Sequence, residues 1–108
     1  MWMIEPNLLC RAHLLGEHGE IHKHRHNFVK QHKISGRIFP VVQIEPLSMQ
    51  SRHDELVEEM ERRGYNHASP YEMPDLSYLP DELRLARVDL QVSMLQLTSC
   101  AECQKRIK

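Results

Sequence analysis

The chain has 108 residues, 41% of them apolar and 27% charged, which is the size and composition of one small soluble domain. Its formal net charge of −1 excludes a protein that binds nucleic acid through a positive charge over its whole surface. No apolar run approaches the roughly 20 residues that a membrane-spanning helix needs, and the three cysteines do not make a closed disulfide framework. These features predict a cytoplasmic protein without a membrane partner.

The first seven residues, MWMIEPN, are predicted to form an extended leader. The proline disfavours a helix before it, and the asparagine can cap a helix that follows. That first helix is expected from about Leu8 to Lys33. Gly16 and Gly19 inside it together cost on the order of 2 kcal/mol relative to alanine. They indicate either a close approach by another backbone or a ligand phosphate, or a simple kink.

A polar stripe runs along this predicted helix between two apolar flanks. At about 100° per residue, His13, Glu17 and His24 fall within roughly 60° of Glu20. Such groups are rarely buried without partners, so the stripe is expected to point into a cleft suited to acid–base chemistry. A solvated helix face with accidental histidines would produce the same pattern.

The middle of the chain is predicted to hold a connection and a second helix. Residues 34–46 are broken by glycine and proline, and their IFPVVQI run is at most one short strand, which cannot form a sheet alone. A helix from about Ser48 to Arg63 follows, with favourable ion pairs at i,i+4 spacing such as Glu59 with Arg63. Gly64 is a good stop for this helix.

A third helix is expected to open at Pro80, because proline and acidic residues are favoured in a first turn. Its buried stripe is predicted to be Leu83, Ala86, Leu90, Met94 and Leu97. Residues 99–108 are expected to be a flexible tail. The sequence therefore predicts a single all-α domain, residues 1–108, with three main helices.

The distribution of charge is more informative than its sum. No acidic residue occurs from Ile21 to Ile44, and the basic residues of that segment are Lys23, Arg25, Lys30, Lys33 and Arg37. This asymmetry can provide one positive face that contacts phosphates. An ordinary solvated face is the alternative.

Two patterns have the spacing of metal ligands. His18, His22 and His26 follow one another at i, i+4 and i+8, and Cys100-x-x-Cys103 is half a zinc site or a redox pair. Neither pattern supplies a complete set of ligands, so we expect no metal and no cofactor. A metal-binding protein that uses these histidines or cysteines is kept as an alternative.

Three ordered blocks of sequence resemble the pyrimidine-dimer DNA glycosylase family, the endonuclease V-like enzymes. They are HLLGEHGE (13–20), RHDELVEEMERRGYN (52–66) and DLSYLPDEL (75–83). The resemblance implies a compact all-α, endonuclease V-like fold and an enzyme that removes a damaged base and nicks the strand. The chain differs from the family pattern at Gly19 and Lys23, which stand where the family pattern has an arginine. It also differs at the C-terminus, which lacks a basic aromatic tail.

The resemblance also implies the catalytic groups. The α-amine of the first residue attacks the sugar C1′ to give an imine, and a glutamate at the position of Glu20 assists β-elimination. Trp2 hinders removal of the initiator methionine, so the amine belongs to Met1. We expect a monomer that binds damaged double-stranded DNA through Arg11, His13, Glu17, Lys23, Arg25, Lys33 and Arg37. A non-catalytic DNA-binding module of the same fold is the other alternative.

Overall fold

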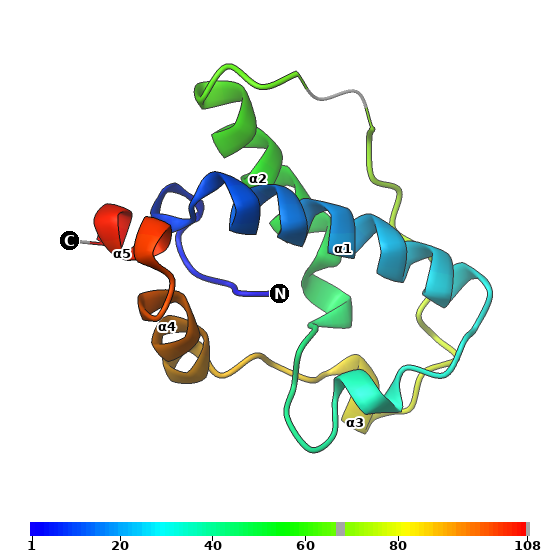
Figure 1. The fold of residues 1–108 in the computed structure, drawn as a ribbon. Helices are drawn as coiled ribbons and strands as arrows, with labels where there is room; N and C mark the ends of the chain where they lie inside the picture. Colours follow the sequence, from blue (N-terminus) through cyan, green and yellow to red (C-terminus); the bar gives the residue numbers. More distant parts are fainter. Residues whose placement is uncertain (67–68, 108) are drawn as a thin grey trace.

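Two long helices, α1 (Arg11–Val29) and α2 (Met49–Arg62), cross at the centre of the computed structural model (Figure 1). The structure describes residues 1–66 and 69–107, and over this part of the chain it contains helices and no strands, as the sequence predicts. The shorter helices are α3 (Asp81–Arg84), α4 (Leu90–Thr98) and α5 (Ala101–Ile107), and 3-10 turns lie at Pro6–Leu8 (η1), Ser35–Arg37 (η2) and Pro46–Ser48 (η3). No helix in the described ranges combines the length and apolar character needed to cross a membrane.

The core forms between the apolar faces of α1 and α2. Leu14, Ile21 and Phe28 repeat every seven residues on one face of α1 and are at most 1% exposed. They belong to the same buried cluster as Leu56 and Met60 of α2. Full burial of a side chain of this size contributes about 1.5–3 kcal/mol, so this face fixes how α1 lies on α2.

The N-terminal leader turns back along α1, and the N-terminus lies near the middle of the molecule (Figure 1). Met3 makes this turn with a φ of 57°, in the left-handed region that costs a non-glycine residue about 1–2 kcal/mol. Two contacts hold the segment in place: the Ile4 side chain is buried in the core, and the Arg63 guanidinium binds the backbone. Arg63 donates to the carbonyl oxygens of Leu9 at 2.7 Å and Pro6 at 3.2 Å.

Helix α2 matches the predicted range of Ser48 to Arg63 closely, whereas α1 is shorter than predicted at both ends. Within α2, Glu59 and Arg63 form the expected ion pair at 2.7 Å, and Gly64 follows the helix with a φ of 84°.

Helix α1 starts at Arg11 instead of Leu8, because Pro6–Leu8 form the turn η1, and its N-cap is Cys10 instead of the expected asparagine. It ends at Val29 instead of Lys33 and continues through its glycines. A Cβ atom at Gly16 or Gly19 would meet no atom within 4 Å, so the expected approach of another backbone at these positions is wrong.

The predicted third helix is divided into α3 and α4. The Asp89 side chain accepts hydrogen bonds from Gln91 N and Val92 N and starts α4, while Glu45 accepts from Val88 N at 2.7 Å. These bonds compete with a continuous helix, and Leu90 is consequently 53% exposed instead of buried. Where a flexible tail was expected, residues 101–107 form α5, which packs against α4 and η1.

Candidate active site

The α-amine of Met1 lies directly against Glu20. It donates hydrogen bonds to Glu20 Oε1 at 2.7 Å and to the carbonyl oxygen of Gln43 at 2.7 Å. The Met1 side chain is buried, and its sulfur accepts a hydrogen bond from Glu45 N at 3.3 Å, whereas the Glu20 side chain is 37% exposed. The leader therefore delivers a fixed amine to a carboxylate that remains accessible.

A cavity of about 700 Å³ opens beside this pair. Met1, Trp2 and Glu20 form one part of its lining, residues 40–43 another, and the segment from Arg87 to Gln96 the rest. Glu45 holds this last wall, because its buried carboxylate binds Val88 N and Arg87 Nη1. The same bonds that divide the predicted third helix thus shape the cavity.

His24 lies one helical turn beyond Glu20 and is 3% exposed. Burial lowers the pKa of His24 below its ordinary value; the Glu20 carboxylate opposes this effect, and the charges of Arg37, the Met1 amine and Lys23 reinforce it. Asn27 Nδ2 lies 3.3 Å from His24 Nδ1, and since an amide nitrogen only donates, Nδ1 accepts. The lowered pKa favours the neutral imidazole, and the contact with Asn27 is compatible with Nδ1 as the acceptor.

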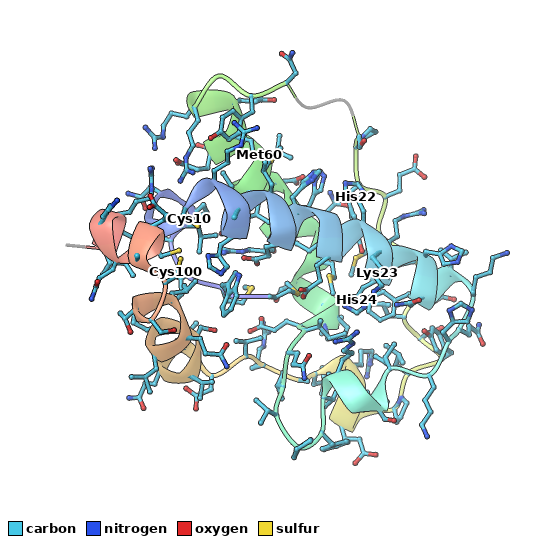
Figure 2. All side chains as sticks on the ribbon, viewed as in Figure 1. Cys10, His22, Lys23, His24, Met60 and Cys100 are labelled. Atoms are coloured by element: carbon cyan, nitrogen blue, oxygen red, sulfur yellow. The ribbon has the colours of Figure 1, made fainter. Side chains whose placement is uncertain are left out.

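The basic residues predicted to bind DNA occupy different surroundings. Lys23 precedes His24 on α1 (Figure 2). Lys23 and Arg37 are both exposed, and both are close enough to act electrostatically on His24. Lys33 is also exposed. Arg25 donates to the carbonyl oxygen of Glu72 at 2.6 Å, and Arg11 lies 4.9 Å above the Tyr65 ring.

Two predicted neighbours of Glu20 lie away from the cavity lining. Glu17 accepts two hydrogen bonds from Arg52, at 2.6 and 3.0 Å, and neither side chain is more than 1% exposed. His13 Nδ1 lies 3.1 Å from the sulfurs of both Cys10 and Cys103. The structure therefore brings Met1 and Glu20 together at the cavity and engages Glu17 and His13 with other partners outside its lining.

Several site residues were not singled out from the sequence. The carbonyl of Gln43 and the wall at Arg87–Gln96 carry no local pattern that would mark them. His24 was noticed on the polar stripe but not assigned to the site. Arg52 begins the RHDELVEEMERRGYN block, but its pairing with Glu17 is visible only in the structure.

The fold and the site define a class: an all-helical domain in which an N-terminal amine meets a helical glutamate at an open cavity. A family model described as pyrimidine dimer DNA glycosylase matches residues 1–73, and the chain belongs to this family. Family membership implies DNA glycosylase activity and a damaged-DNA substrate. The comparisons with curated proteins and with solved structures gave no match.

Proposed function

We propose that this protein is a DNA repair glycosylase with AP-lyase activity whose nucleophile is the Met1 amine. One observation carries the proposal: the amine nitrogen lies 2.7 Å from a carboxylate oxygen of Glu20, on the lining of a cavity of about 700 Å³. This distance is within the range for direct proton transfer between a catalytic base and its partner. An amine whose only role is to form an ion pair with a carboxylate does not need an open cavity beside it.

In the first step, the neutral amine attacks C1′ of the damaged nucleotide. As the N–C1′ bond forms, the glycosidic bond breaks and the base leaves with its electron pair. The nitrogen passes a proton to Glu20, and opening of the sugar ring, with protonation of O4′, gives the imine. As a class, α-amines lose their proton at much lower pH than lysine side chains, which suits them to this attack near neutrality.

In the second step, Glu20 acts as a general base. Its carboxylate removes a proton from C2′, the electrons of that C–H bond form the new C2′–C3′ double bond, and the C3′–O bond breaks. The 3′ phosphate leaves with the electron pair, which nicks the strand. Water then hydrolyses the imine and regenerates the amine. The exposure of Glu20 supports access to the sugar, and His24, whose pKa is lowered by burial, lies close enough to interact electrostatically with Glu20.

The surroundings of the cavity support binding of DNA. Exposed Lys23 and Arg37 act electrostatically on His24, one turn from Glu20, and can supply positive charge for phosphates. Arg25, Lys33 and Arg11 are the other basic residues expected to contact DNA. Val41, which lines the cavity, and Phe39, which precedes the lining residue Pro40, are about half exposed (50% and 52%). Apolar side chains at this place suit the faces of unstacked bases better than phosphates.

Borohydride trapping on DNA that contains an abasic site tests the proposal. Untagged protein is mixed with the DNA and reduced, and the covalent adduct is digested and mapped by mass spectrometry. The expected adduct is on the nitrogen of Met1. N-terminal acetylation is expected to abolish it without unfolding the protein, as judged by circular dichroism.

Two outcomes contradict the proposal. An adduct that maps to a lysine places the nucleophile elsewhere. Salt-dependent binding to damaged DNA with no adduct and no strand cleavage supports the non-catalytic module instead. Intact-mass measurement of the same preparation establishes that the chain starts at Met1, so that a blocked or extended terminus is not mistaken for an inactive enzyme.

A further inference from the structure

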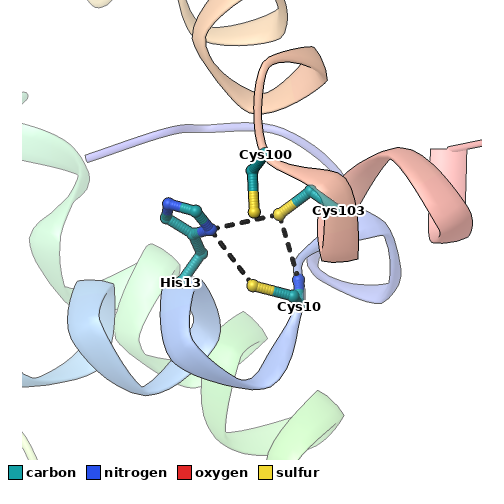
Figure 3. A group of neighbouring side chains, drawn as sticks. All are labelled: Cys10, His13, Cys100 and Cys103. Carbon is teal, nitrogen blue, oxygen red and sulfur yellow. Dashed lines mark hydrogen bonds between the residues drawn. The ribbon is translucent and has the colours of Figure 1, made fainter.

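A cluster of three cysteines and one histidine lies at the opposite end of α1 from Lys23 and His24 (Figure 2). Cys10 and His13 come from the start of α1, and Cys100 and Cys103 from the start of α5 (Figure 3). All four ligand atoms lie within 4.8 Å of one another. Contacts that span about ninety residues of sequence thus bring together two short ligand pairs, Cys-x-x-His and Cys-x-x-Cys.

We propose that these four side chains form a structural zinc site. With Zn–S bonds of about 2.3 Å and a Zn–N bond of about 2.0–2.1 Å, the ligand atoms of a tetrahedral site lie about 3.6–3.8 Å apart. His13 Nδ1 is 3.1 Å from the sulfurs of Cys10 and Cys103, and no two of the four ligand atoms are more than 4.8 Å apart. Changes of no more than about 1 Å in the distances between the ligand atoms would produce the tetrahedral arrangement.

The two ligand pairs occupy equivalent positions in the backbone. Cys10 and Cys100 each accept the first i→i+4 hydrogen bond of their helix, from Leu14 N and Gln104 N, both at 2.9 Å. His13 and Cys103 follow three residues later in the first turn, which directs each pair toward the same point. Helical geometry therefore fixes the two pairs before any metal arrives.

Contacts around the four ligands fit a metal centre. Cys10 N donates to Cys103 Sγ at 3.3 Å, the kind of hydrogen bond that stabilises a metal-bound thiolate. Trp2 meets the His13 ring edge-on at 5.2 Å and restricts its orientation. Cys10 and Cys103 are buried, and Cys100 and His13 are half-buried. Four protein ligands leave no position for a substrate, which is typical of a structural site.

A second group, His18, His22 and His53, also gathers possible ligands. It offers three imidazoles, whereas the cysteine cluster offers four ligands that include three thiolates, the donors that zinc favours in structural sites. We therefore assign the zinc to the cysteine cluster. The assignment replaces the expectation of no metal and gives His13 the role of a ligand in place of a DNA contact.

Zinc at this position would connect three segments that determine the active site. It ties α5, which lies beyond the matched residues 1–73, to the start of α1. Through Trp2 it also supports the leader that carries the Met1 amine. Closing so long a loop with a metal stabilises the folded state, because the unfolded chain has no preformed site.

The first test is elemental analysis of untagged protein purified under reducing conditions without added chelator. We expect one zinc per chain. Cys100→Ser, at the half-buried ligand, is expected to lose it, and His22→Ala is the matched control that removes one imidazole from the other group and keeps the zinc. The assignment is overturned if the His22→Ala variant loses the zinc and the Cys100→Ser variant retains it. It is also overturned if the wild-type protein contains no metal or contains iron.

Cobalt substitution tests the same site without depending on how a variant folds. Wild-type protein is stripped of metal, reduced and titrated with Co²⁺. We expect the intense visible bands of tetrahedral cobalt together with thiolate-to-cobalt charge transfer in the near ultraviolet, saturating at one equivalent and displaced by Zn²⁺. A weak octahedral spectrum, or a disulfide that forms within the cluster and resists reduction, overturns the proposal.

Discussion

Glu17 and Glu20 lie less than one turn apart on the same helix, and the structure gives them opposite surroundings. Glu17 has no exposed side-chain surface and is bound in a bidentate pair by Arg52. Glu20 is 37% exposed, pairs with the Met1 amine and faces the cavity. One carboxylate is enclosed by protein on every side, and the other keeps a side open to a ligand.

This difference separates a charge that stabilises the fold from one that we propose to be reactive. A buried ion pair with good geometry tolerates no loss of either partner, because the remaining charge stays desolvated. A half-exposed pair is screened by water and contributes little to stability. Glu20 can therefore be committed to chemistry without weakening the fold, whereas Glu17 holds α1 on α2.

The largest effect is expected from Glu20→Gln. Loss of the general base is expected to lower the single-turnover rate of strand cleavage at an abasic site by about 10²–10⁴-fold, while the free energy of unfolding changes by less than about 1 kcal/mol. Quenched-flow kinetics and urea titration measure the two quantities. Glu58→Gln, an exposed position on α2, is the control and is expected to change neither. An unchanged rate for Glu20→Gln removes Glu20 from the mechanism.

Glu17→Gln is expected to show the reverse pattern. It leaves the Arg52 guanidinium buried with a weakened partner, at a cost of about 3–5 kcal/mol in the free energy of unfolding. Glu55→Gln removes the exposed partner of the same arginine and is expected to cost less than about 1 kcal/mol. Equal effects from the two variants would mean that burial does not distinguish these glutamates.

A double replacement sharpens this result. Glu17→Leu combined with Arg52→Met removes both charges and keeps apolar volume in the core. It is expected to recover most of the stability lost in Glu17→Gln, since well-packed apolar residues often replace a buried ion pair without loss. Urea titration measures the recovery, and an additive further loss would show that the pair supports the fold in another way.

The local elements could be predicted from the sequence, and the resemblance to the family pointed to Met1 and Glu20, which the structure brings within 2.7 Å of each other. Helix α2, its stop at Gly64 and the polar stripe of α1 follow from residues close together in the chain. The break before α4 could not be predicted, because it depends on Glu45, more than forty residues away. The enclosure of Glu17 depends similarly on Arg52.

The cysteine cluster shows the same limit. The sequence shows Cys100-x-x-Cys103 as half a zinc site and places His13 on the polar stripe of the first helix, but no local pattern joins Cys10 to these residues. Only the packing of α5 beside η1 brings the two pairs together. Spacing within a segment was visible in the sequence, whereas the pairing of segments required the fold.

His24 is expected to contribute to the pH dependence of the free energy of unfolding. Because burial lowers the pKa of His24 below its ordinary value of 6.5, the unfolded chain binds this proton more readily than the folded protein. Its contribution is fully present above about pH 6.5 and is lost as the pH falls below that value. Urea titrations from pH 7.5 to 5 are expected to show a smaller loss of stability for His24→Gln than for wild type. Parallel pH profiles would show that other groups carry the dependence.

The smallest effects are expected at the two glycines that flank Glu17 and precede Glu20. Since a Cβ atom meets nothing within 4 Å at Gly16 or Gly19, alanine at either site is expected to raise the free energy of unfolding by about 0.5–1 kcal/mol through its better helix propensity. The two variants differ in what lies nearby, because Gly19 adjoins the reactive glutamate. If the space above Gly19 admits a DNA phosphate, Gly19→Ala gains the same stability as Gly16→Ala but weakens binding to abasic DNA, as measured by fluorescence anisotropy. Equal DNA binding by the two variants would mean that alanine at these positions acts only through its helix propensity. The phosphate would then bind elsewhere on the rim of the cavity.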